Sequence, residues 1–132
     1  MSQENVEIVR RATEGVNDSG VESLLAYCDP SIAWHTTGEF PDSGVYEGRE
    51  GVRRAYKEME ADLDGVRYEI EEIRGAGEWV VVTGRMTGLG RIAGVPFERP
   101  LAFATRLHKG RYVEVRQFVD PTDAYRAAGL AG

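Results

Sequence analysis

EWVVVTGRMTGLG, residues 78–90, decides the fold because it is rich in β-branched residues and a second segment of the same kind follows it. That second segment is VPFERPLAFATRLH, residues 95–108, and the four residues between the two predict a turn. Residues 107–119, LHKGRYVEVRQFV, predict a further hairpin that turns at Lys109. In the strand before these segments the alternation of apolar and charged residues breaks at Ile73, which predicts a bulge or a strand end. The second half of the chain therefore predicts an antiparallel sheet.

The first half of the chain predicts helices. Apolar residues recur at helical spacing in three segments: residues 3–16, 21–28 and 52–63. Ser19 and Glu22 match a capping box that would begin the second helix. Asp120, followed by proline, predicts the N-cap of a short C-terminal helix. This order predicts an α+β fold in a single domain over residues 1–132, with a curved antiparallel sheet wrapped around the N-terminal helices.

Composition narrows the possible partners. The chain of 132 residues has a net charge of −6, and acids interrupt every group of Lys and Arg, so we expect no nucleic-acid partner. No apolar run approaches the roughly 20 residues that cross a bilayer, so we expect no membrane partner either. The single cysteine, Cys28, excludes an internal disulfide and favours a reducing, cytoplasmic location.

A sheet bent around helices leaves a hollow, and such a hollow is the usual site for a small, partly apolar ligand. The two histidines, His35 and His108, belong to distant strands, so the sequence predicts no metal site. The glycine-rich segment GLGRIAG leads into a strand rather than a helix, which argues against a phosphate-binding loop. We therefore expect neither a metal nor another cofactor.

Three segments resemble the nuclear transport factor 2-like superfamily and, within it, the SnoaL-like group. They are LLAYCDPSIAWH (residues 24–35), YEGREGVRRAY (residues 46–56) and KGRYVEVRQFVD (residues 109–120), and the order of the predicted elements agrees with them. The resemblance covers the chain from end to end. It implies a cone-shaped α+β barrel with an internal pocket, commonly as a homodimer. It does not imply one activity, because the fold hosts isomerases, cyclases, hydrolases and non-catalytic modules.

The resemblance makes His35 the candidate catalytic base, because ketosteroid isomerases of this fold place their base aspartate at the matching position. Ala33, His35 and Thr37 share one face of the predicted strand, and we expect that face to line the pocket. An imidazole there could remove a proton beside a carbonyl. The alternative is a histidine that only forms hydrogen bonds in the pocket. The loop over residues 38–48 would cover the mouth of the pocket.

Other positions depart from the enzymes of the fold. Residues 3–16 contain no tyrosine for an oxyanion hole, and the second donor position of the isomerases matches Phe103. The aspartate of SnoaL-type cyclases matches Gln117, which can hold a carbonyl but cannot transfer a proton. The Arg-x-Asp pair of limonene epoxide hydrolases matches Arg85 and Thr87, so its acid is missing too.

The predicted pocket therefore has His35, Arg85 and Gln117 as its polar groups. The other predicted lining residues are Tyr56, Met59, Trp79, Thr83, Thr87 and Phe103. Arg85 could hold a carboxylate or a carbonyl, and its alternative is an ion pair with Glu98 or Glu114. If the protein is an enzyme, we expect an isomerase or cyclase that abstracts a proton beside a carbonyl. The alternative is a non-catalytic ligand-binding, carrier or accessory module.

The predicted outer face of the sheet is apolar, which favours a homodimer. We assign five residues to that face: Val80, Val82, Met86, Ala102 and Ala104.

Overall fold

The structure of the protein, a computed structural model, describes residues 2–36 and 44–130. Its elements follow in the order α1 (Ser2–Ser19), α2 (Val21–Leu25), β1 (Cys28–His35), β2 (Val45–Glu47), α3 (Gly48–Asp62), β3 (Leu63–Ala76), β4 (Trp79–Gly90), β5 (Pro96–His108), β6 (Arg111–Phe118) and α4 (Pro121–Ala127). Thr37 and the part of the predicted covering loop before residue 44 lie outside the described residues.

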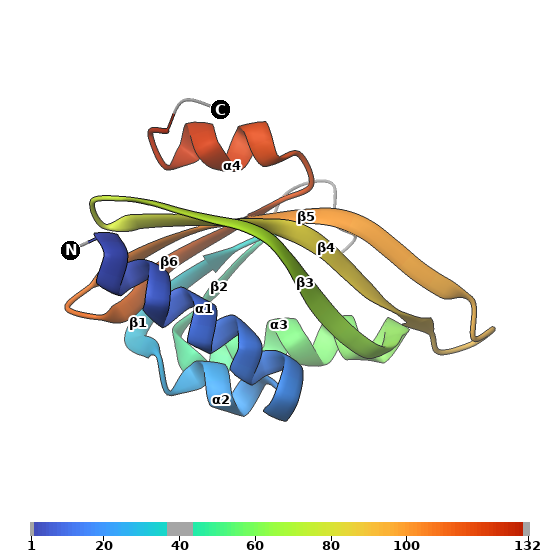
Figure 1. Cartoon of the computed structure of the whole chain (residues 1–132). Helices are drawn as coiled ribbons and strands as arrows, with labels where there is room; N and C mark the ends of the chain where they lie inside the picture. The colour runs from blue at the N-terminus through green and yellow to red at the C-terminus, as the bar shows by residue number, and fades with distance from the viewer. Residues whose placement is uncertain (1, 37–43, 131–132) are drawn as a thin grey trace.

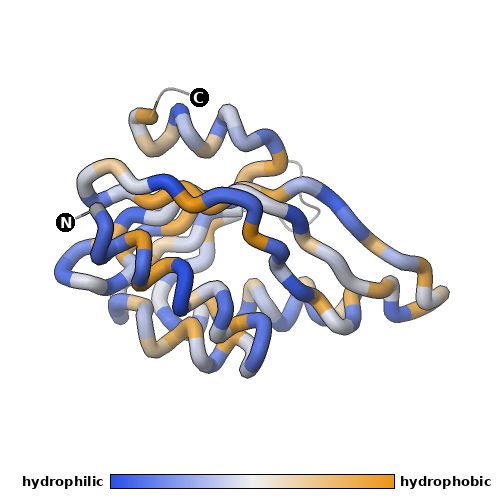
Figure 2. Tube along the Cα trace, in the orientation of Figure 1, coloured by the Kyte–Doolittle hydropathy of each residue, from blue (hydrophilic) through white to orange (hydrophobic). Residues whose placement is uncertain are grey.

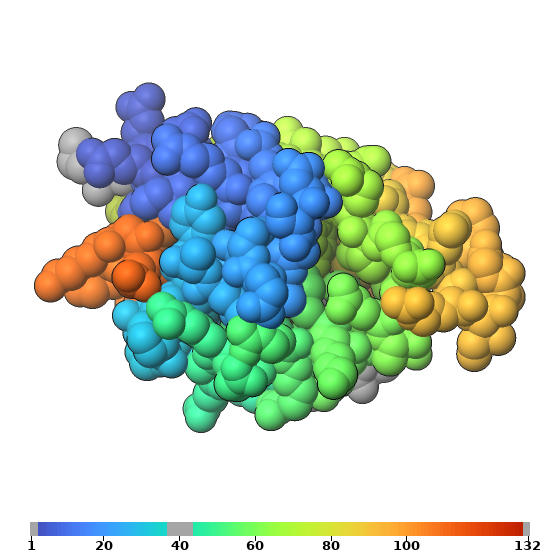
Figure 3. All heavy atoms as spheres, turned by 90° about the horizontal axis from the view of Figure 1, so that it is seen from below, coloured from blue at the N-terminus to red at the C-terminus, as the bar shows by residue number. Residues whose placement is uncertain are grey.

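The strands form one curved, six-stranded sheet in the order β2-β1-β6-β5-β4-β3. All neighbouring strands are antiparallel except β1 and β6, which are parallel. Helices α1, α2 and α3 lie on the concave side of the sheet, and α4 lies on the convex side (Figure 1). Seen from the helix side, α1, α2 and α3 cover the sheet together, and the β4–β5 end projects past them (Figure 3). The predicted α+β architecture is confirmed.

The long β3–β4 pair contains the irregularities that bend the sheet. Its register shifts between Asp64 and Arg67 and again between Ile70 and Glu72, the second shift lying close to the break that the sequence predicts at Ile73. A bulge increases the local twist of a strand pair and bends it. Gly84 lies at the second shift, where a Cβ atom would stand 1.9 Å from the carbonyl oxygen of Glu69. Only glycine allows the strands to approach so closely there.

Apolar residues are buried on both faces of the sheet (Figure 2). The larger cluster fills the space between the concave face and helices α1 to α3, and the smaller cluster joins α4 to the convex face. Asp120 caps α4 as predicted, because its carboxylate accepts a hydrogen bond of 2.9 Å from the backbone N–H of Thr122. No helix within the described residues is long and apolar enough to cross a membrane.

The predicted outer face is wrong for three of its five residues. Val80, Val82 and Met86 belong to the concave-side cluster, whereas Ala102 and Ala104 lie on the convex face beneath α4. The run of valines in β4 is buried on both faces of the sheet, because α4 covers part of the convex face. Alternation within such a run cannot tell which side faces the helices.

The second helix also differs from the prediction. Ser19 is the last residue of α1, so it forms no capping box with Glu22. Gly20, with φ of 83°, separates the two helices instead. Helix α2 then ends at Leu25, and Cys28 already begins β1. The predicted third helix and the hairpin turn at Lys109, which has φ of 52°, are confirmed.

Candidate functional site

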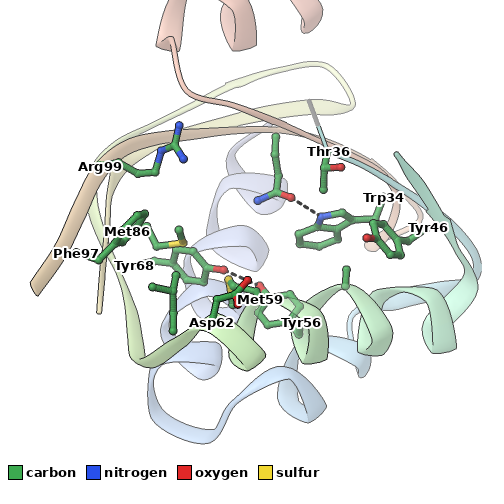
Figure 4. A pocket seen from close by; sticks show the side chains of 13 residues that line it. Trp34, Thr36, Tyr46, Tyr56, Met59, Asp62, Tyr68, Met86, Phe97 and Arg99 are labelled. Atoms are coloured by element: carbon green, nitrogen blue, oxygen red, sulfur yellow. Dashed lines mark hydrogen bonds between the residues drawn. The ribbon is translucent and has the colours of Figure 1, made fainter. Parts of the chain in front are cut away.

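A cavity of about 230 Å³ lies between the concave face of the sheet and helix α3. Aromatic side chains form much of its wall: Trp34, Tyr46, Tyr56, Tyr68 and Phe97. Its aliphatic and sulfur-containing lining consists of Ala55, Met59, Leu63 and Met86. Its other polar lining consists of Thr36, Asp62, Arg99 and Gln117. Figure 4 shows these side chains converging on the cavity from the sheet and from α3.

Interlocking aromatic rings make one wall of the cavity rigid. The ring of Trp34 meets that of Tyr56 edge to face at 5.8 Å between centroids, and that of Phe103 at 5.9 Å. Phe103 in turn meets Tyr68 at 5.6 Å in the same manner. Edge-to-face contacts of this kind are favourable beyond simple burial. The rings therefore hold the indole of Trp34 in one orientation.

Gln117 contributes a buried polar group to the cavity. It shares the concave face of β6 with Val115, and its side chain is 8% exposed. The indole Nε1–H of Trp34 donates a hydrogen bond of 2.9 Å to its Oε1 (Figure 4). An indole N–H can only donate, so the amide oxygen must face it and the amide nitrogen is turned away. That nitrogen donates no hydrogen bond to any described residue.

Two buried tyrosines bring a second polar group to the cavity. The hydroxyl oxygens of Tyr56 and Tyr68 are 3.2 Å apart and share a hydrogen bond. Burial raises the pKa of Tyr56 well above its ordinary value and that of Tyr68 to about 12. Both phenols are therefore neutral at physiological pH and cannot serve as bases. The hydrogen bond between the two hydroxyls uses one of their two protons. The other hydroxyl proton remains available for a hydrogen bond to a ligand.

Charged groups lie at the end of the cavity away from Trp34. Figure 4 shows Arg99 of β5 and Asp62, the last residue of α3, on opposite sides of that end. The turn between β4 and β5 is attached to the helix there, because the backbone N–H of Arg91 donates to the carbonyl oxygen of Asp62 at 3.1 Å. The cavity is thus charged at one end and carries neutral donors at the other.

The structure brings only part of the predicted site together. Gln117, Tyr56 and Met59 line the cavity. Phe103 lies on the same face of the sheet and lines a smaller adjoining cavity of about 30 Å³. The sequence did not predict Trp34 as a pocket residue and favoured its neighbour His35 instead. Nor did it single out Tyr68, although the alternation of apolar and charged residues in β3 marks Tyr68 as facing inward.

The predicted orientation of His35 is wrong. Ile32 and Trp34 are buried on the concave face, so Ala33 and His35 point to the convex face. There the Nε2 atom of His35 is 3.6 Å from a carboxylate oxygen of Glu114. The small size of Ala33 suggested room for a ligand, but burial of the larger Ile32 and Trp34 side chains fixes which way the strand faces.

Glu114 is the centre of an ion-pair network on the convex face. Its carboxylate accepts hydrogen bonds from Arg116 at 2.6 Å and from Arg106 at 3.4 Å, beside His35. Burial acts to raise the pKa of Glu114, but the hydrogen bond and charge of Arg116, assisted by Arg106 and His35, bring that pKa below its ordinary value. His35 therefore belongs to a surface network on the side of the sheet away from the cavity.

The predicted β4 residues also lie on the convex face. Arg85 forms an ion pair with Glu98 of β5, which was the alternative to ligand binding. Thr87 is paired in register with Glu98, next to Arg85. Thr83 is buried beside Ala102, and Trp79 packs against the cluster beneath α4. The prediction that these β4 residues line the pocket is therefore wrong for all four of them: Trp79, Thr83, Arg85 and Thr87. Their strand faces the other way because Val80, Val82 and Met86 fill the concave side.

Within the described residues, no group of three or more His, Cys, Asp or Glu side chains is placed to hold a metal ion.

The family model of the SnoaL-like domain matches residues 9–115, and the chain belongs to this family. No curated protein matches the chain significantly. Among solved structures, an NTF2-like protein from Burkholderia thailandensis E264 is 25% identical, with 98% of each chain covered and a TM-score of 0.80.

Two further solved structures of the same fold contain small molecules. TerC, co-crystallised with polyporic acid, is 20% identical, with 95% of this chain and 97% of TerC covered and a TM-score of 0.79. A Catenulispora acidiphila DSM 44928 protein of ketosteroid isomerase-like fold, in complex with trimethylamine, is 18% identical, with 94% and 93% covered and a TM-score of 0.76. At these identities the likeness shows the fold alone.

Proposed function

We propose that the protein binds a small, planar and largely apolar ligand in the cavity between the concave face of the sheet and α3, and that it holds an oxygen atom of that ligand. One observation carries the proposal: an aromatic cavity of about 230 Å³ contains a buried amide group, that of Gln117, whose nitrogen has no acceptor among the described residues. That nitrogen is therefore left to donate to an oxygen of a ligand in the cavity. Polyporic acid with TerC and trimethylamine with the Catenulispora protein support small-molecule binding by this fold.

Binding without chemistry is favoured by the protonation states of the inner groups. A base that removes a proton beside a carbonyl must be able to accept it near neutral pH. Tyr56 and Tyr68 keep their protons because burial raises the pKa of both phenols. Gln117 cannot accept a proton, and His35 lies on the other face of the sheet. A carrier, sensor or accessory role agrees with this set of groups.

A second function is favoured by Asp62. It is the one acid among the described residues that line the cavity. With a ligand carbonyl held by Gln117, the Asp62 carboxylate could abstract a proton beside that carbonyl, as in an isomerisation or an aldol-type cyclisation, without a cofactor. Asp62→Asn should abolish such turnover and leave ligand binding intact.

Matched substitutions in α3 test the binding proposal. Ala55 lines the cavity, whereas Ala61, on the same helix, is exposed and does not. Ala55→Phe should fill the cavity and lower the affinity for fluorene, a planar tricyclic probe, at least about fivefold, since lost aromatic contacts cost ~1 kcal/mol. Ala61→Phe should bind fluorene like the parent. Equal affinities in isothermal titration calorimetry for Ala55→Phe and the parent would refute the site.

We also propose a cytoplasmic homodimer. The part of the convex face that α4 leaves uncovered carries an open groove lined by Ala33, His35, Val113 and Arg116, among others. A second copy related by a two-fold axis could place its acidic groups opposite the arginines of this groove. The single buried Cys28 supports the cytoplasmic location. Sedimentation that gave the mass of one chain at micromolar concentration would refute the dimer.

A further inference from the structure

We infer that Trp34 orients the Gln117 amide so that its NH₂ group is left to donate into the cavity, and that the cavity therefore favours a ligand with a carbonyl-type oxygen over one with an N–H group. The inference rests on the proposed function and names the class of ligand: a planar ketone or quinone rather than a planar amine or indole. Trp34 is then a positioning residue that acts through Gln117.

The contact between the two side chains leaves the amide one orientation. Trp34 is 4% exposed and Gln117 8% exposed, so water is largely excluded from their 2.9 Å hydrogen bond. If the amide turned over, its NH₂ group would face the indole N–H, and two buried donors would oppose each other without an acceptor. Such a loss disfavours the turned amide by roughly 5- to 100-fold.

The indole itself cannot move to accommodate a turned amide. Its ring is held edge to face by Tyr56 on α3 and by Phe103 on β5, at interplanar angles of 72° and 67°. These rings come from different elements, so moving the indole would disturb both the helix and the sheet. The amide nitrogen therefore stays directed away from Trp34, and its two hydrogens remain for a ligand.

The tyrosine pair does not discriminate between a carbonyl-type oxygen and an N–H group of the ligand. A hydroxyl can donate or accept by rotating about its C–O bond, so Tyr56 and Tyr68 tolerate either kind of ligand group. The orientation of the Gln117 amide is therefore the feature that favours an oxygen acceptor.

Three tricyclic probes of nearly the same shape test the inference by titration calorimetry. Fluorene carries no polar group, 9-fluorenone carries a carbonyl acceptor, and carbazole carries an N–H donor. The parent should bind 9-fluorenone about 5- to 100-fold more tightly than carbazole, because carbazole would leave two donors facing each other. Fluorene should bind with intermediate affinity. Equal affinities for 9-fluorenone and carbazole in the parent would overturn the inference.

Substitutions separate the role of Trp34 from general damage to the cavity. Trp34→Phe keeps an aromatic ring and removes the N–H, so it should bring the 9-fluorenone to carbazole preference close to one, with both affinities expressed relative to that of fluorene for the same variant. Gln117→Leu should abolish the preference as well. Trp79→Phe alters the other tryptophan, on the convex face, and should keep the parent preference. A parent-like preference in Trp34→Phe would overturn the positioning role.

Failure of the inference is distinguishable from failure of the proposed function. If fluorene does not bind the parent, the proposed function fails. The amide orientation is then measured in the free protein by the exchange of the Trp34 indole N–H with solvent, observed by nitrogen-15 NMR. Gln117→Leu removes the acceptor and should speed that exchange roughly tenfold. An unchanged exchange rate would show that Gln117 does not hold the indole, and the inference would fall.

Discussion

Gly84→Ala should destabilise the protein severely, because the bend of the sheet brings two backbones together at this residue. An added Cβ would lie 1.9 Å from the carbonyl oxygen of Glu69, whereas Cβ contacts below 3.0 Å are essentially never found. Strands β3 and β4 would have to separate by about 1 Å, at the register shift after Ile70. Overpacking of this kind costs about 1–3 kcal/mol, and each ladder hydrogen bond lost adds about 1 kcal/mol. We expect a loss of about 2–5 kcal/mol.

Urea denaturation followed by circular dichroism measures this loss. Gly90→Ala is the matched control, because Gly90 is also in β4, does not have a positive φ, and would place its Cβ 3.7 Å from the nearest atom, an ordinary contact. The control should change the free energy of unfolding by less than about 1 kcal/mol. If Gly84→Ala unfolded at the same urea concentration as Gly90→Ala, the close approach of β3 to Gly84 would be refuted.

Three further predictions test the site and its surroundings. His35→Ala should bind 9-fluorenone like the parent in calorimetry, because the imidazole is on the convex face; a tenfold loss would contradict that orientation. Asp120→Ala should lower the free energy of unfolding by about 1 kcal/mol in urea, because the backbone N–H of Thr122 loses its acceptor. Tyr56 and Tyr68 should not ionise near pH 10 in ultraviolet titration, since burial raises the pKa of both. Both folded-state pKa values are raised, so the contribution to stability is full below about pH 10, and that of Tyr68 is lost as the pH rises through about 12.

The fold could be predicted from the sequence because its signals agree with one another. Helical spacing before residue 64, β-rich segments after it and turn residues between them all predict helices packed against an antiparallel sheet. The boundary errors have local causes. Ser19 matches a capping box, yet α1 continues through it and stops at Gly20. The predicted second helix runs to residue 28, but Cys28 already begins β1; Pro30 lies in this strand where the pairing with β6 is irregular, and proline is tolerated at such positions.

Where both sides of a strand are apolar, the sequence could not predict which side chains point toward the helices and which point to the convex face. In β4 the sequence WVVV offers large apolar residues to each face, and only the later docking of α4 explains why both are buried. The same uncertainty placed Arg85 in the pocket, although its ion pair with Glu98 was the stated alternative. Because the side-chain period of a strand is two, one wrong choice of face moves every residue of the strand. Gln117 was predicted from the match to the aspartate of SnoaL-type cyclases and not from alternation, and it lines the cavity.

Trp34 explains both why His35 faces away from the cavity and how the Gln117 amide is oriented within it. Burial of its large ring turns β1 so that the neighbouring imidazole faces away from the cavity, which removes the candidate base. The same ring brings an N–H group to Gln117, at a position where SnoaL-type cyclases are expected to carry an aspartate. The oxygen of this amide accepts the indole hydrogen bond and its nitrogen can donate to a ligand oxygen, but the amide cannot transfer a proton as a carboxylate could. Glutamine at this position therefore supports the proposal that the residue holds a ligand rather than transfers a proton.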